Sequence, residues 1–189
     1  GCNKSGVPRQ VMSNAVYLVS SLPTLQFGDT PPFSLDEFRR QCEGVISAYE
    51  MEALEALLAG KSHSDSFVSA YFARETLLKN IAGKMRAAAW DSDIRFSERP
   101  YDGYDVTYAK MVSDALLRTN PLEREHELDK ARFWLVDELS GVGGFTMDHV
   151  YAYAIKLMIC ERWSRLSPEA GDASLMKVIN ENDLASKRE

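Results

Sequence analysis

The sequence has few of the residues that cross-link small domains. Its 189 residues include three cysteines, Cys2, Cys42 and Cys160, and no two of them share a close spacing. Cys42 and Cys160 lie inside apolar segments with helical patterning. The odd number and the wide spacing therefore indicate reduced, buried thiols, and we expect a cytoplasmic protein.

Long apolar runs are also absent. A membrane span needs roughly 18 to 20 apolar residues, whereas the longest run covers residues 150–160 and contains Lys156. We expect this run to be a buried core helix. The N-terminus lacks the apolar region of a signal peptide, so we interpret residues 1–11 as a disordered N-terminal extension, with Met12 close to the natural start. The alternative is a processed lipoprotein anchored through Cys2.

A basic surface is missing as well. The chain has 22 Lys and Arg against 28 Asp and Glu, which gives a formal net charge of −6, and the basic residues are dispersed. Affinity for phosphate needs a basic footprint, so we expect no nucleic-acid partner. The hydrophobic content of 45% and charged content of 26% are those of an ordinary globular protein.

Motifs for catalysis or metal binding are not evident. His63, His126 and His149 do not pair with one another or with carboxylates at metal-ligand spacing. Four aspartates gather in one segment without the alternation of an EF-hand loop: Asp91, Asp93, Asp102 and Asp105. The glycines of residues 141–144 follow a helical pattern and predict a helix-to-helix turn. We predict no catalytic, cofactor-binding or metal-binding residues, and the sequence leaves the partner-binding residues unknown.

Signals for helices recur in the first half of the chain. A capping box at Ser34, with Phe33 placed to pack on the following turn, opens one helix. A second capping box at Ser47 opens another, which we expect to end at Gly60 in a left-handed conformation. Apolar residues at three- and four-residue steps predict a long third helix over residues 67–90, which Gly83 should weaken in its middle.

The second half has still clearer helix signals. Residues 106–119 are helical in pattern, and Asn120 with Pro121 ends that helix and caps the next. One continuous apolar face then follows, which Gly141 closes: Leu128, Ala131, Leu135 and Leu139. A further helix opens near residue 145, and a last short one is predicted over residues 173–180.

Two features leave alternatives open. The apolar, β-branched run of residues 15–19 fits either a strand or the first turns of a buried helix. Residues 33–38 and 145–150 share an order of residue types at helix starts. That likeness indicates either a duplicated helical unit or the same capping solution reached twice.

Tryptophan and arginine lie close together on the two longest helices of the second half. Trp134 follows Arg132, and Trp163 follows Arg162. We expect cation–π contacts or an Arg and Glu network across this hairpin, with Trp163 packed as a structural residue. The alternative is that part of this surface is a docking site.

Together these patterns predict an all-α fold of antiparallel helical hairpins in two packed subregions. The N-terminal subregion covers residues 12–90 and the C-terminal subregion residues 106–183. Residues 91–105 lack periodicity and form an irregular loop that is a boundary or a mobile segment. Residues 184–189 form a charged tail.

Several short stretches carry a family resemblance. They are residues 17–23 (YLVSSLP), 120–124 (NPLER), the helix of residues 129–138, residues 153–157 (YAIKL) and residues 161–163 (ERW). Together they resemble a family of short proteins of unknown function associated with bacterial V-type ATP synthase genes. That family is similar to the socket subunit of the prokaryotic V/A-type ATPase, the helical protein that joins the central stalk to the membrane ring.

The resemblance implies a function without catalysis. It implies a helical fold like that of the socket subunit and a rotor-linker, accessory or assembly protein of a V-type ATPase, acting in ion transport through stalk or membrane-ring subunits. Such a protein would be cytoplasmic and peripherally associated with the inner face of the membrane. The socket subunit is built from three similar helical units, whereas this chain has room for about two. The alternative is a stand-alone helical protein-binding module, lipid-anchored in the lipoprotein interpretation.

Overall fold

Helices make up the regular structure of the chain. The structure is a computed structural model that describes residues 16–89 and 96–166, and within these ranges there are helices and no strand. The helices are α2 (Leu35–Cys42), α3 (Ala48–Leu58), α4 (Ser66–Ala89), α5 (Val106–Leu116), α6 (Pro121–Ser140) and α7 (Met147–Ser164). The all-α prediction is confirmed for this part of the chain.

Some predictions fall outside the described residues. They are the extension of residues 1–11, the start at Met12, the anchor at Cys2, the short helix of residues 173–180 and the charged tail of residues 184–189.

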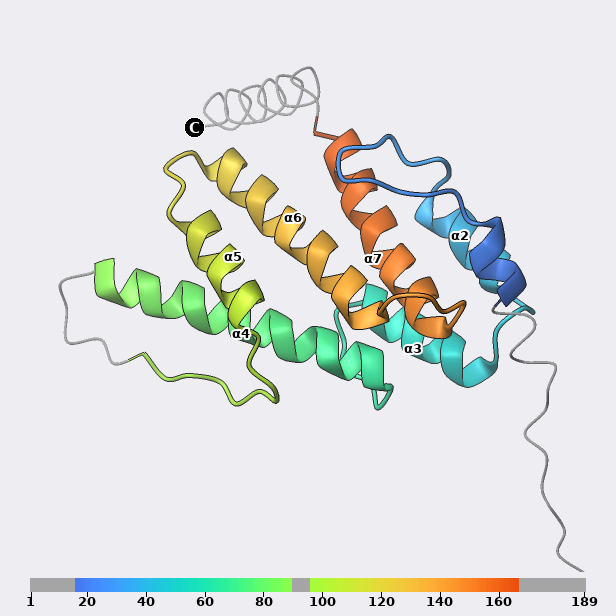
Figure 1. The fold of residues 1–189 in the computed structure, drawn as a ribbon, viewed down its shortest axis with the longest axis horizontal. Helices are drawn as coiled ribbons and strands as arrows, with labels where there is room; N and C mark the ends of the chain where they lie inside the picture. The colour runs from blue at the N-terminus through green and yellow to red at the C-terminus, as the bar shows by residue number, and fades with distance from the viewer. Residues whose placement is uncertain (1–15, 90–95, 167–189) are drawn as a thin grey trace, which may run out of the picture.

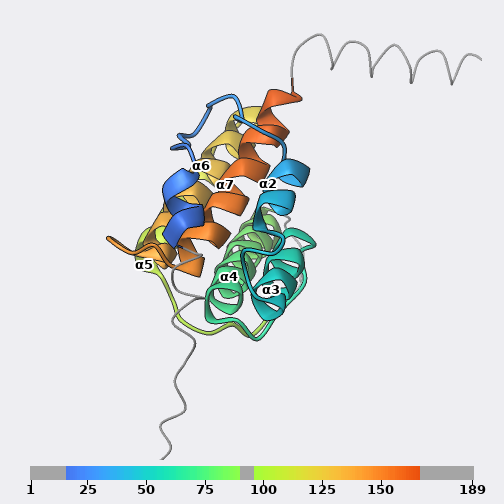
Figure 2. The ribbon, with the colours of Figure 1, turned by 90° about the vertical axis from the view of Figure 1, so that its right-hand side faces the viewer.

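Helices α5, α6 and α7 lie side by side in this order, each antiparallel to the next. A short turn joins α5 to α6, and residues 141–146 join α6 to α7, so that α6 contacts both. α4 runs across all three, and α2 and α3 pack against α7 (Figure 1). Figure 2 shows the same arrangement from the side, with α6 and α7 above α3 and α4. The predicted hairpin of the second half is therefore formed by α6 and α7.

Helix ends follow the predicted signals. The Ser47 hydroxyl accepts a hydrogen bond from the Glu50 amide at 3.3 Å, and the Glu50 carboxylate accepts one from the Ser47 amide at 2.7 Å. At Ser34 only half of the predicted capping box forms: the hydroxyl accepts from the Glu37 amide at 3.2 Å, and no return bond to the Glu37 carboxylate is present. Gly60 and Gly141, just beyond α3 and α6, have φ values of +70° and +73°. Only glycine takes this conformation without a steric cost.

The N-terminal segment is helical where it is described. Residues 16–21 form helical turns, which decides between the two interpretations of residues 15–19 in favour of the helix. The chain then runs over α7 without regular structure, and the ring of Phe27 makes edge contacts with Phe133 and Trp163.

The shared residue pattern at residues 33–38 and 145–150 produces two different helix starts. Phe33 stacks on Phe38, and Ser34 caps α2 with its hydroxyl. At the start of α7, Thr146 makes no side-chain capping bond, and its hydroxyl lies 3.0 Å from Nδ1 of His149. The same capping solution is therefore not reached twice, and the duplication stays a prediction.

The loop before α5 is fastened to α4. The side-chain amide of Asn80 donates to the carbonyl oxygen of Arg99 at 2.8 Å and accepts from its amide at 3.0 Å. A Cβ on Gly83 would lie 2.1 Å from the ring of Phe96, so glycine makes room for that ring within the helix. The described part of the predicted loop, residues 96–105, is thus held against α4. The domain boundary placed there stays a prediction.

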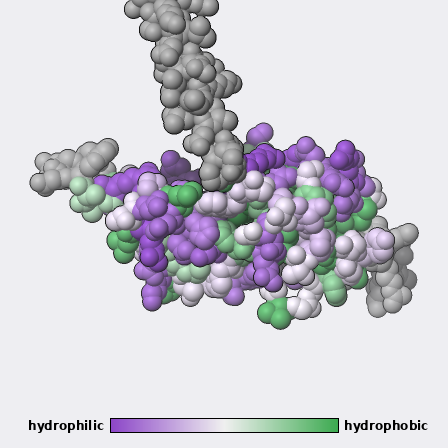
Figure 3. Space-filling view, turned by 90° about the horizontal axis from the view of Figure 1, so that it is seen from above, coloured by the Kyte–Doolittle hydropathy of each residue, from purple (hydrophilic) through white to green (hydrophobic). Residues whose placement is uncertain are grey.

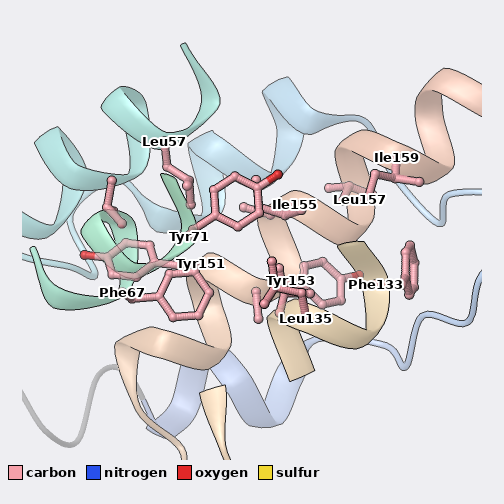
Figure 4. Packing of buried hydrophobic residues seen from close by; sticks show 14 of the residues in the cluster. Leu57, Phe67, Tyr71, Phe133, Leu135, Tyr151, Tyr153, Ile155, Leu157 and Ile159 are labelled. Carbon is pink, nitrogen blue, oxygen red and sulfur yellow. The ribbon is translucent and has the colours of Figure 1, made fainter. Parts of the chain in front are cut away.

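The core is continuous from α2 to α7. One cluster of buried apolar residues contains Leu57 of α3, Tyr71 of α4, Leu135 of α6 and Ile155 of α7 (Figure 4). The predicted face of α6 is confirmed, because its first three members are buried and Leu139 is partly buried against the core cluster.

The apolar run of residues 150–160 lies within α7. All of its residues are buried except Lys156 and Met158, which are half-buried, so this run is a core helix as expected. Across the described ranges, no helix combines the length and the apolar character that crossing a membrane requires.

Two cysteine thiols should be unreactive in the native protein. Cys42 and Cys160 are free and buried; burial raises the pKa of Cys42 to about 12, and burial followed by the charge of Asp29 raises the pKa of Cys160. The thiolate is the reactive form, so at about pH 8 iodoacetamide should leave both thiols unmodified until guanidinium unfolds the chain. Peptide mapping by mass spectrometry checks this, and labelling of native Cys42 at the unfolded rate would contradict it.

Candidate functional site

Five side chains from three helices meet around one buried carboxylate, and we call them the Asp129 cluster. They are Glu75 of α4, Asp129 and Arg132 of α6, and Arg162 and Trp163 of α7. The indole Nε1 of Trp163 donates to Oδ2 of Asp129 at 2.8 Å, and Nη1 of Arg132 donates to Oδ1 at 2.8 Å. Arg162 donates to Oδ2 as well. Asp129 is fully buried, at 0% exposure, and receives all three donors.

A bidentate ion pair joins α4 to this cluster. Nε and Nη2 of Arg132 donate to the two carboxylate oxygens of Glu75, at 2.8 and 3.2 Å. Burial by itself would lower the pKa of Arg132, but the hydrogen bonds and charge of Glu75 outweigh it and raise the pKa. Arg132 is therefore charged, and it bridges two carboxylates on different helices.

Local sequence positions these groups. Asp129 and Arg132 are three residues apart and share one side of α6. Arg162 lies in the last turn of α7, where a positive charge is favoured by the helix dipole. Because α7 is antiparallel to α6, its last turn lies beside the first half of α6.

The neighbouring residue Glu161 fixes another helix. Its Oε1 accepts a hydrogen bond from the Leu35 amide at the start of α2 at 2.7 Å, and its Oε2 accepts one from Arg165 at 3.0 Å. A carboxylate at a helix N-terminus is stabilised by the unpaired amides and the helix dipole. The run Glu161–Trp163, one of the stretches that carry the resemblance, therefore contacts both α2 and α6.

The cluster forms part of the wall of a cleft of about 330 Å³. The rest of the wall is mostly apolar and includes Leu57, Leu58, Tyr71, Phe72, Ile155, Met158 and Ile159. Burial, followed by the charge of Glu75, raises the pKa of Tyr71, so this hydroxyl stays neutral. All four carboxylate oxygens of Glu75 and Asp129 already accept hydrogen bonds. The cluster therefore has the character of a structural network that fixes α4, α6 and α7 relative to one another.

The three histidines have separate partners and do not form one site. His63 accepts from the Asp65 amide through Nδ1 at 3.1 Å, and His149 pairs with Thr146. His126 makes edge contacts with the rings of Phe27 and Trp163. Among the described residues, no group of three or more His, Cys, Asp or Glu side chains is placed to hold a metal ion.

Two of the four loop aspartates can be placed, and both have local roles. Asp105 caps α5 by accepting from the Tyr108 amide at 2.9 Å. The carbonyl oxygen of Asp102 accepts from Arg74 at 3.0 Å. Asp91 and Asp93 lie outside the described residues.

An arginine network is present, but it differs from the expected Arg and Glu network across the hairpin: Arg162 pairs with Asp129 across the hairpin, and the glutamate that pairs with Arg132 lies on α4. The sequence indicates Arg132 and Arg162 as its members, but it assigns neither Asp129 nor Glu75 to them. One signal in the sequence could have indicated Asp129. It lies seven residues before the apolar Val136 and therefore shares its side of the helix, and the structure shows both residues fully buried. No local pattern points to Glu75, which is 57 residues from Arg132. Trp163 is half-buried and bonded to Asp129, in agreement with a structural role.

In the described residues, the fold and the cluster define a helical protein whose antiparallel hairpin is held by ion pairs to the buried Asp129. Residues 99–184 match a family described as a protein of unknown function (DUF2764). The match includes α5, α6 and α7, and with them every cluster residue except Glu75. No curated protein and no solved structure matches the chain. These comparisons give no link to the socket subunit of a V-type ATPase.

Removing the charge of Asp129 should strongly destabilise the fold. Asp129→Asn leaves Arg132 and Arg162 without their shared carboxylate, and breaking a buried ion pair costs about 3 to 5 kcal/mol. Asp137→Asn is the matched control on the same helix, since Asp137 is largely exposed and pairs with Lys156. Exposed pairs contribute about 0 to 1 kcal/mol. Urea unfolding of both variants checks this, and equal losses of stability would contradict it.

Proposed function

We propose that this protein is a non-catalytic rotor-linker, accessory or assembly protein of a V-type ATPase or ATP synthase. The observation that carries the proposal is the α6–α7 hairpin, in which the resembling stretches Asn120–Arg124, Tyr153–Leu157 and Glu161–Trp163 lie together. That hairpin is also covered by the family match of residues 99–184. The likeness to the socket subunit rests on the sequence resemblance alone.

The physical character of the hairpin supports a mechanical or assembly role. A linker has to transmit force between partners without its helices sliding past one another. Glu75 and Arg132 couple α4 to α6, and Asp129 couples α6 to α7. Glu161 couples α7 to α2 through its partly buried bond to the α2 backbone. Sliding any of these helices would separate a charge from its partner in a partly desolvated site, which is costly.

The alternative is a stand-alone helical protein-binding module. Exposed apolar residues favour it, because Val142 and Phe145 in the α6–α7 turn are open to solvent. Such residues at the tip of a rigid hairpin are suited to contacts with another protein. This alternative requires no ATPase partner.

Affinity capture from native membranes separates these two functions. We expect the tagged full-length chain to recover stalk or membrane-ring subunits of the ATPase, identified by mass spectrometry, while the tag alone recovers none. Capture should be repeated at low salt, where electrostatic contacts between partners are strongest. Repeated absence of these subunits under that condition would overturn the ATPase proposal, and specific recovery of other proteins instead would favour the stand-alone module.

A further inference from the structure

The cleft beside the Asp129 cluster has the size and the lining of a ligand pocket. Its volume is about 330 Å³, and pockets for small molecules have volumes of about 300 to 1,000 Å³ and mostly apolar walls with a few polar groups. Figure 4 shows Leu57 and Ile155 converging from α3 and α7, with Tyr71 of α4 between them. The apolar side chains of the cleft are Leu57, Leu58, Phe72, Ile155, Met158 and Ile159. The face of the molecule drawn in Figure 3 differs from this wall, because hydrophilic residues predominate there and hydrophobic ones are scattered among them.

The charges that line the cleft are not balanced. Lys79, Arg132 and Arg162 are positive, whereas Glu75 and Asp129 are negative. Both carboxylates already accept hydrogen bonds from the two arginines, so their charge is compensated within the protein. One positive charge is left over, in a chain whose formal net charge is −6. The cleft therefore favours a negatively charged group, although the chain as a whole is negative.

Two of the positive side chains have donors to spare. Lys79 is exposed, and it has no hydrogen bond or ion pair with any residue that the structure describes. Arg162 gives one nitrogen to Asp129, and its side chain is 48% exposed. A guanidinium has five N–H donors, so Arg162 keeps donors for a further oxygen. Both side chains can therefore donate to an anion in the cleft.

The Tyr71 hydroxyl is a third donor, and it belongs to a much more buried residue. Tyr71 is 5% exposed, and its hydroxyl makes no hydrogen bond within residues 16–89 and 96–166. In Figure 4 this hydroxyl points away from Phe67, toward the side of Ile155. Burial and then the charge of Glu75 raise its pKa, so the hydroxyl keeps its proton. Buried polar groups normally have a hydrogen-bond partner, and a ligand oxygen in the cleft would supply one.

Helix geometry places these donors beside the apolar wall. Tyr71, Glu75 and Lys79 follow one another at four-residue steps along one side of α4. On α7, Ile155 and Arg162 are two turns apart on the side that lines the cleft. Each helix thus offers a mostly apolar side chain first and a cation about 10 Å further along its axis. A molecule with an apolar body and one negative end matches this order.

We propose that the cleft binds a small organic anion with an apolar body and one carboxylate. The carboxylate accepts hydrogen bonds from Lys79, Arg162 and the Tyr71 hydroxyl, and the apolar body lies against the apolar side chains of the wall. Such a ligand contacts α3, α4 and α7 at once. This inference goes beyond the proposed function and does not depend on the ATPase partner.

Three probes separate the two parts of the proposed ligand. Octanoate has a carboxylate and an apolar chain, octanol has the chain without the charge, and acetate has the carboxylate without the chain. In methyl NMR spectra of the full chain, octanoate should shift the signals of Leu58, Met158 and Ile159, and leave that of the exposed Val142 unchanged. We expect octanoate to bind at least about tenfold more tightly than octanol or acetate.

Three outcomes of these titrations would overturn the proposal. They are the absence of octanoate binding, equal affinity for octanoate and octanol, and octanoate shifts confined to methyl groups outside the cleft.

Single substitutions test the donors. Calorimetric titration should show octanoate binding weakened about tenfold by Tyr71→Phe, which removes one hydrogen bond to the carboxylate. Lys79→Gln should weaken it about threefold, since Lys79 is exposed. Lys110→Gln is the matched control, because Lys110 is an exposed lysine of α5 outside the cleft, and it should leave the affinity unchanged. Equal octanoate affinity in all three variants would contradict the assignment of these donors.

Discussion

The rest of the structure depends on the buried carboxylate of Asp129. An ionised carboxylate removed from water is stable only when its oxygens are fully hydrogen-bonded and its charge is paired. Asp129 meets this requirement with Arg132 from its own helix and with Arg162 and Trp163 from α7. Apolar packing between two helices allows some sliding and rotation, but three directed bonds to one carboxylate do not. The position of α7 along α6 is thereby fixed.

The placement of α2 and α4 depends on the position of α7 along α6. With the last turn of α7 held beside α6, Glu161 lies where it can accept from the first amide of α2. Arg132 extends the same charge network to Glu75, which holds α4 across the hairpin. Trp163 presents its indole N–H to Asp129, while its ring contacts Phe27 and lines a pocket together with Leu122. The candidate functional site and the framework of the fold are thus the same residues.

Local features of the fold could be predicted from the sequence because local physics determines them. The caps at Ser34, Ser47 and Asn120 act within one turn of their helices, and the glycines after α3 and α6 act on their own backbone. The helix of residues 16–21 was ambiguous because its short apolar run has no periodicity that separates strand from helix. Periodicity also identified the buried face of α6.

Long-range pairs could not be predicted in the same way. Glu75 meets Arg132 only because α4 crosses α6, and Phe96 meets Gly83 only because the loop before α5 returns along α4. From the sequence alone, Gly83 is only a residue that lowers the stability of its helix. The ring of Phe96, which lies where a Cβ on residue 83 would be, is distant in sequence and leaves no local pattern. The ATPase role is a proposal that combines a sequence resemblance with the ion pairs that hold the hairpin, and no local pattern in the sequence indicates those pairs.

A double-mutant cycle between Asp129 and Trp163 tests most directly whether the cluster acts as one unit. Asp129→Asn, Trp163→Phe and the double variant would be compared with the unmodified protein by urea unfolding. Directly bonded residues show coupling energies of about 0.5 to 3 kcal/mol, so the double variant should lose less stability than the two single losses combined. Asp137→Asn with Trp163→Phe provides an uncoupled reference. Additivity of the Asp129 and Trp163 losses within about 0.3 kcal/mol would contradict the account.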